Sequence, residues 1–110
     1  MAQVKINPGI CGLNSTIKVE SDEMQNVSVC IKSECESIQA MEVGLKEIDG
    51  YEECFSKFGD STVYQQAKLH CRHPACPVPS AIIKGIEVAC GLALPKDVEI
   101  EISKFDLDQL

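Results

Sequence analysis

Apolar and polar residues alternate along the first third of the chain, which is typical of strands that bury one face of a sheet. The turn signal NPG at 7–9 and the polar run SDEMQN at 21–26 interrupt this alternation and suit turns between strands. The alternation returns near the C-terminus, where Val98, Ile100 and Ile102 alternate with acidic residues. The pattern therefore predicts strands at 2–7, 15–21, 25–32 and 97–103.

In the middle of the chain, apolar residues recur every three or four positions, as they do on one face of a helix. SECE at 33–36 has the form of a capping box, and Asp60-Ser61 is a second cap signal. The last apolar stretch has only a narrow polar stripe, so its helix should be the most buried. We predict four helices, which begin near Ser33, Tyr51, Ser61 and Ser80; Asp49-Gly50, Gly59 and Pro95 are expected to end the first, the second and the fourth.

The order of these elements is three strands, four helices and a final strand, βββαααα then β. This order predicts an α+β fold, in which helices pack on one face of a four-stranded antiparallel sheet and the other face meets solvent. A length of 110 residues indicates a single cysteine-rich domain, 1–110.

The charge balance argues against a nucleic-acid partner. Lys and Arg total 10 against 17 Asp and Glu, which gives a formal net charge of −7, and the cations are scattered along the chain. No uncharged stretch approaches the ~20 residues that cross a bilayer, and the start MAQVKINPG lacks the pattern of a signal peptide. We therefore expect a cytoplasmic protein that binds neither nucleic acid nor membrane.

Seven cysteines in 110 residues are many, and an odd number fits a closed disulfide framework poorly. In a reducing compartment they indicate metal binding, thiol chemistry or small core residues. Cys35 and Cys76 lie near predicted helix starts, where unpaired backbone N–H groups stabilise a thiolate. The alternative for Cys35 is a small core residue in its helix, and Cys54 and Cys90 are expected to be packed thiols.

Cys71 and Cys76 flank the loop CRHPAC, which its prolines should stiffen. An ordered loop loses less entropy when it places metal ligands, and a spacing of four residues is usable for a metal site. Cys11 lies in NPGICG, where glycines leave N–H groups free to point at a sulfur. The alternative is a turn that happens to contain a cysteine.

The order of the cysteines resembles the TSCPD domain, found at the end of cobalamin-dependent ribonucleotide reductases and as a free-standing small protein. The stretches that match are PGICG before a strand, IKSEC at a strand-to-helix step and HCRHPACP before a helix. The chain departs from that family at Ala75 and Val78, which replace a serine and an aspartate. It also resembles a stand-alone family of small cysteine-rich proteins that share CPVPSAIIKGIEVACGLALPKD. The resemblance implies a fold and a metal but no reaction. The cysteines and the proline of the family's pattern correspond in this chain to Cys11, Cys35, Cys71, Cys76 and Pro77.

The first hypothesis is a metal-binding protein in which four cysteines meet at one end of the sheet. They would hold zinc or, less favoured, an iron–sulfur cluster. Four thiolates give a closed tetrahedral zinc site, which would be structural because no position stays open for water. If His73 replaced one cysteine, zinc would be favoured over a cluster. The predicted metal ligands are Cys11, Cys35, Cys71 and Cys76.

Two other hypotheses remain open. In one, the chain is a thiol redox protein or a cysteine-nucleophile enzyme, in which Cys76 attacks, Cys71 resolves and His73 assists. In the other, it is an interaction or assembly protein whose cysteines fill the core. A ridge of small residues from Ala81 to Ala93 would then serve a protein partner or a homodimer. The sequence leaves open whether the chain is an enzyme.

Overall fold

Three strands at the start of the chain pair as antiparallel neighbours and form most of a sheet. They are β1 (Ala2–Ile6), β2 (Ser15–Asp22) and β3 (Asn26–Ser33) in a computed structural model, which describes residues 1–23 and 25–109. The register places Ile17 opposite both Val4 and Ile31, so the apolar positions of all three strands lie on one face. The strands predicted at 2–7, 15–21 and 25–32 are confirmed.

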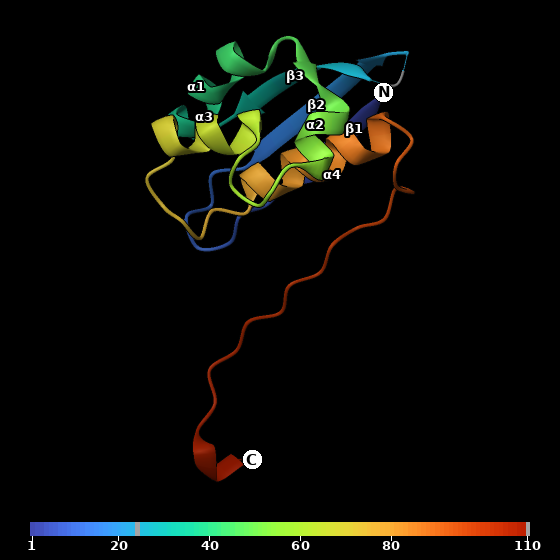
Figure 1. Ribbon diagram of the computed structural model, residues 1–110. Coiled ribbons are helices and arrows are strands. Elements are labelled where there is room, and N and C mark those ends of the chain that lie inside the picture. Colours follow the sequence, from blue (N-terminus) through green and yellow to red (C-terminus); the bar gives the residue numbers. More distant parts are fainter. Residues whose placement is uncertain (24, 110) are drawn as a thin grey trace.

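The helices pack on one face of this sheet (Figure 1). The predicted α+β class and the four-stranded antiparallel sheet are therefore confirmed. Among the described residues, none of the helices is long and apolar enough to cross a membrane. The helices are α1 (Glu36–Ala40), which continues as the 3-10 segment η1 (Met41–Leu45), α2 (Gly50–Phe55), α3 (Thr62–His70) and α4 (Val78–Ala89).

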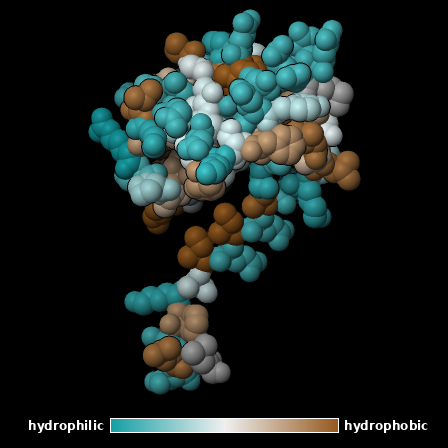
Figure 2. Space-filling view, in the orientation of Figure 1, coloured by the Kyte–Doolittle hydropathy of each residue, from teal (hydrophilic) through white to brown (hydrophobic). Residues whose placement is uncertain are grey.

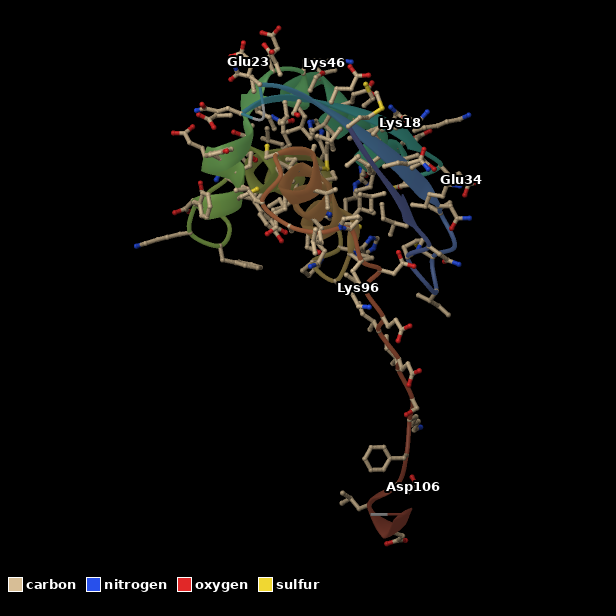
Figure 3. All side chains as sticks on the ribbon, turned by 90° about the vertical axis from the view of Figure 1, so that its right-hand side faces the viewer. Lys18, Glu23, Glu34, Lys46, Lys96 and Asp106 are labelled. Carbon is tan, nitrogen blue, oxygen red and sulfur yellow. The ribbon has the colours of Figure 1, made fainter. Side chains whose placement is uncertain are left out.

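The core lies between the sheet and the helices, because the alternation of each strand sends its apolar side chains to the helical face. Ile17 and Val29 of the sheet and Ile82 and Ile86 of α4 are fully buried in it. Polar side chains of the same strands point to the opposite face, as Figure 3 shows for Lys18. One face of the sheet is therefore dry and the other is open to solvent.

The fourth strand is not the one that the alternation predicted. It is β4 (Ile48–Asp49), which pairs with Asn26 and Val27 of β3. The predicted strand at 97–103 is wrong: these residues form part of a tail that runs away from the sheet (Figure 1) and ends in a short 3-10 segment, η2 (Leu107–Gln109). Alternation is a local property, so it indicates which residues could share a face but not which strand they would pair with.

Side chains from α1 and η1 occupy the rest of the β3 edge. The backbone N–H of Ile31 donates to Glu42 Oε2 at 2.6 Å, and the N–H of Ser33 donates to Gln39 Oε1 at 2.9 Å. Gln39 Nε2 in turn donates to the carbonyl of Ile31 at 2.8 Å. These bonds satisfy backbone groups that an added strand would need, so this edge is closed to further pairing.

The ends of the first helix differ from their prediction. Ser33 does not cap it; its Oγ accepts from the N–H of Cys35 at 3.0 Å, and Cys35 is itself the N-cap residue. Local side-chain bonding of this kind competes with capping. The helix changes to 3-10 geometry at Met41. The chain then enters β4, where the apolar spacing predicted that the helix would continue.

Helix α4 ends at Ala89, before the predicted stop at Pro95. Gly91 has a φ of 72°, and the backbone N–H of Leu92 donates to the carbonyl of Glu87 at 2.8 Å, which closes the helix in a left-handed turn. The Oγ of Ser21 donates to the carbonyl of Ala89 at 2.9 Å. The C-terminal end of α4 is therefore fixed at the end of the sheet that holds Ser21.

The small residues of α4 pack against the chain's own sheet. A Cβ added at Gly85 would lie 2.8 Å from Val4 Cγ2 and 3.3 Å from Val19 Cγ2. Ala89 is buried as well. The middle of the ridge from Ala81 to Ala93 therefore packs closely on β1 and β2 of its own chain, and the idea that the ridge serves a partner stays a prediction.

Candidate functional site

Topology brings four of the cysteines to one end of the sheet. Ile6 at the end of β1 pairs with Ser15 at the start of β2, and Ser15 pairs with Ser33 at the end of β3. Cys11 is in the loop between β1 and β2, and Cys35 follows β3 by two residues. Because the C-terminal end of α4 lies at the opposite end of the sheet, its N-terminal end and the α3–α4 loop lie here too (Figure 1).

Cys71 is at the centre of this group. It is the C-cap residue of α3, and its backbone N–H donates to the carbonyl of Ala67 at 2.8 Å. Its thiol lies 3.7 Å from the Sδ of Met41, which is fully buried. Burial, together with the nearby thiols of Cys76 and Cys35, raises the pKa of Cys71 to about 11. The sulfurs of Cys76 and Cys35 therefore lie close enough to Cys71 to influence its ionisation.

Cys35, Cys71 and Cys76 are each half-buried against the hydrophobic core, and we call these three the cysteine cluster. Cys35 is positioned by Ser33, whose Oγ is also hydrogen-bonded to Ser15 Oγ at 2.7 Å. Cys76 is positioned by a turn in which its N–H donates to the carbonyl of His73 at 3.1 Å. The cluster thus joins three separate segments of the chain over one part of the core.

Cys11 is at the same end but exposed. The base of its loop is fixed to the residue next to Cys35: the N–H of Asn14 donates to Glu34 Oε1 at 2.7 Å, and the N–H of Glu34 donates to the carbonyl of Asn14 at 3.0 Å. Glycine at 12 is required because its φ is 69°. The loop is thus anchored beside the cysteine cluster, while the sulfur itself stays in solvent.

His73 is exposed in the α3–α4 loop, two residues from Cys71. In the part of the chain that the structure describes, no group of three or more His, Cys, Asp or Glu side chains is positioned to hold a metal ion. The ligand set Cys11, Cys35, Cys71 and Cys76, with His73 as a substitute, therefore stays a prediction.

The other cysteines lie elsewhere. Cys90 is buried, and Cys54 of α2 is half-buried against the core, so both are the packed thiols that we expected. Burial, together with the charge of Glu87 and the Cys90 thiol, raises the pKa of Cys54 to about 12. Cys30 is exposed on the outer face of the sheet, directly opposite Lys18. All seven cysteines are free thiols.

Sequence reasoning missed two relationships. In the first, the sulfur of Met41 in η1 contacts Cys71. The thiol of Cys90 lies close enough to Cys54 to raise its pKa, although 36 positions separate the two residues in the chain. No spacing signal could have found either contact, because the first depends on how α3 packs against η1 and the second on how α2 packs against α4.

Comparison with known proteins identifies the family but no activity. No curated protein and no solved structure matches the chain. One family model matches residues 2–102. It does not confirm the resemblance to the TSCPD domain, which stays a prediction. Because the match covers most of the sequence, the chain belongs to DUF6951, a family of unknown function.

Proposed function

We propose that the protein binds one zinc ion through the cysteine cluster. The observation that carries this proposal is the burial of the Cys71 thiol beside Cys35 and Cys76, which come from three separate segments. Zinc binds thiolates strongly in tetrahedral sites, and three cysteines supply most of such a site. A metal bound here would tie α1, α3 and α4 together at the end of the sheet.

The fourth ligand has two candidates at this end of the sheet. Cys11 would complete a closed site of four thiolates, and His73 would complete a site of three thiolates and an imidazole. Both residues are exposed on loops, so either could close over the cluster. Since the ligands are not in binding positions as the chain stands, binding requires the exposed α3–α4 loop at 72–75 to move.

Binding would also release protons. The raised pKa of Cys71 keeps this thiol protonated at neutral pH, and zinc coordinates the thiolate. Zinc affinity should therefore increase as the pH rises from neutral toward about 11. An iron–sulfur cluster at the same residues is the less favoured form of this proposal, because a histidine ligand would favour zinc.

The same pKa argues against the thiol enzyme. In that hypothesis Cys71 is the resolving thiol and must attack as a thiolate. A pKa of about 11 leaves on the order of one molecule in 10⁴ ionised at neutral pH. Cys76 with His73 would then lack an effective second thiol for disulfide exchange, so this pKa counts against the redox form of the hypothesis.

Metal content and zinc affinity of protein purified without oxygen test the proposal. Competition with a chromophoric chelator should show one zinc ion per chain. Replacement of any member of the cluster, as in Cys35→Ser, Cys71→Ser or Cys76→Ser, should weaken binding by more than roughly 100-fold, since even groups that only orient a ligand contribute about 10–100-fold. Cys30→Ser is the matched control, because Cys30 is exposed on the far face of the sheet.

The fourth ligand is identified by comparing Cys11→Ser with His73→Gln. The variant that removes the true ligand should lose affinity, while the other keeps it. Equal affinity in all cluster variants and in the Cys30→Ser control would contradict the proposal. A coloured protein that contains iron and acid-labile sulfide would replace zinc with an iron–sulfur cluster.

A further inference from the structure

Residues 97–103 have the pattern of a strand but pair with no strand of their own chain. Val98, Ile100 and Ile102 are on one side of the segment and are exposed by 57%, 71% and 91%. Figure 2 shows the tail brown along one side and teal along the other, well away from the body of the molecule. A strand with one apolar side normally buries that side against a sheet or a helix.

The sheet has an open edge of matching character at β1. The strand order ends at β1, and β1 pairs only with β2. Its inward residues Val4 and Ile6 are only half-buried, whereas Ile17 and Val29 on the same face of β2 and β3 are fully buried. At the β1 edge, the apolar face of the sheet therefore extends beyond the part that the helices cover.

Helix α4 lies beside this edge of the sheet. Gly85 packs against Val4. Ala81 and Val88 are on the same face of the helix as Gly85, since they are four and three positions away from it. Both side chains are half-buried. A strand added next to β1 would place its apolar side chains against this helix face and against Val4 and Ile6.

The charges on the other side of the added strand are complementary to the charge of Lys5 in β1. When Val98, Ile100 and Ile102 face the helices, Glu99 and Glu101 face outward with Lys5 of β1. Lys5 is exposed, and the ion pair found among the described residues is between Lys46 and Glu42, at 3.8 Å, elsewhere on the molecule. The acidic side of the tail would thus meet the basic side of the β1 edge.

We propose that two copies of the chain exchange these segments, so that residues 97–103 of each copy pair with β1 of the other as a fifth strand. The tail leaves the body near Lys96 (Figure 3) and runs away from its own sheet (Figure 1). The family model extends to residue 102 and includes most of the segment. Reciprocal exchange gives a closed two-fold dimer and leaves no open β1 edge. The proposal does not depend on zinc.

Sedimentation equilibrium of the full chain, reduced and with a chelator present, measures the dimer. Ile100→Asp places a charge in the apolar side of the exchanged strand and should raise the dissociation constant of the dimer by roughly 100-fold or more. Leu107→Asp is the matched control: the same change at an exposed residue of η2, beyond the strand, should leave the constant unchanged. Both variants keep the core intact, so they should fold.

Charge reversal and hydrogen exchange test the pairing itself. Lys5→Glu should weaken the dimer, and Glu99→Lys with Glu101→Lys in the same chain should restore it. The amides of residues 97–103 should exchange slowly at concentrations where the dimer forms and fast in the Ile100→Asp variant. A chain that stays monomeric at all concentrations would overturn the proposal. Slow exchange of the tail amides in that monomer would show that the tail folds onto its own sheet. A dimer that Ile100→Asp leaves unchanged also overturns the proposal.

Discussion

The Cys71 thiol lies 3.7 Å from the thioether sulfur of Met41, and this contact joins the end of α3 to η1. Met41 is fully buried, so the contact holds one thiol of the cysteine cluster against the core. A thiol in such surroundings resists ionisation because the charged thiolate would lose its hydration. The site therefore combines exposed loops with one thiol whose pKa is raised.

The raised pKa of Cys71 predicts a loss of stability at high pH. Below pH 9.0 the thiol is protonated in the folded and in the unfolded chain. Between pH 9.0 and about 11 the unfolded chain loses this proton while the folded chain keeps it, so the free energy of unfolding should fall as the pH rises. Urea unfolding of the metal-free protein across this range measures the slope.

Cys71→Ala is the comparison for that measurement. It removes the titrating thiol, so its free energy of unfolding should decline less steeply than that of the wild type over the same range. Cys54 also has a raised pKa and contributes to both proteins, which is why the difference between the two slopes is the quantity to use. Equal slopes would show that Cys71 titrates as it does in the unfolded chain.

Gly85→Ala should destabilise the protein although alanine favours helices. The substitution gains about 0.8–1.0 kcal/mol in helix propensity. The new Cβ would, however, lie 2.8 Å from a methyl group of Val4, and overpacking of this kind costs about 1–3 kcal/mol. Denaturant unfolding should therefore show a net loss of up to about 2 kcal/mol. A gain of stability would mean that β1 moves away from α4 easily.

Glu53 should be important for stability although it is charged and buried. Its carboxylate accepts from the backbone N–H groups of Thr62 at 2.9 Å and Val63 at 2.8 Å, at the start of α3. A hydrogen bond to a charged group contributes about 1.5–3 kcal/mol, so the loss of two in Glu53→Ala should cost about 3–6 kcal/mol. Glu53→Gln keeps one acceptor oxygen and should lie between.

The exposed neighbour Glu52 provides the control for that experiment. Glu52→Ala should change the free energy of unfolding by no more than about 0.5 kcal/mol, as is usual for surface sites. If Glu53→Ala were equally mild, the start of α3 would not depend on the carboxylate.

The sequence predicted most of the fold because most of its signals are local. Alternation located β1, β2 and β3, and the cap at Ser61 located the start of α3. The two-residue strand β4 was missed because two residues carry no period. The segment 97–103 has as clear an alternation as β2, yet it is not in the sheet, because alternation does not specify a pairing partner.

The candidate site was predicted only in part. The loop between Cys71 and Cys76 and the turn around Cys11 could be recognised from proline, glycine and cysteine spacing. The outer position of Cys30 followed from the alternation of β3. The depth of Cys71 could not be predicted, because it depends on the packing of α3 against η1. Nor could the sequence show that, among the described residues, the proposed ligands are not gathered around one point.

Cobalt(II) titration of the reduced protein without oxygen probes the proposed zinc site, because cobalt replaces zinc in tetrahedral thiolate sites and is coloured when bound there. A metal site at the cysteine cluster should give charge-transfer absorption from thiolate to cobalt that saturates at one cobalt ion per chain, is displaced by zinc, and is lost in Cys71→Ser but kept in Cys30→Ser. Absence of this absorption, or its persistence in Cys71→Ser, would contradict a metal site at the cysteine cluster.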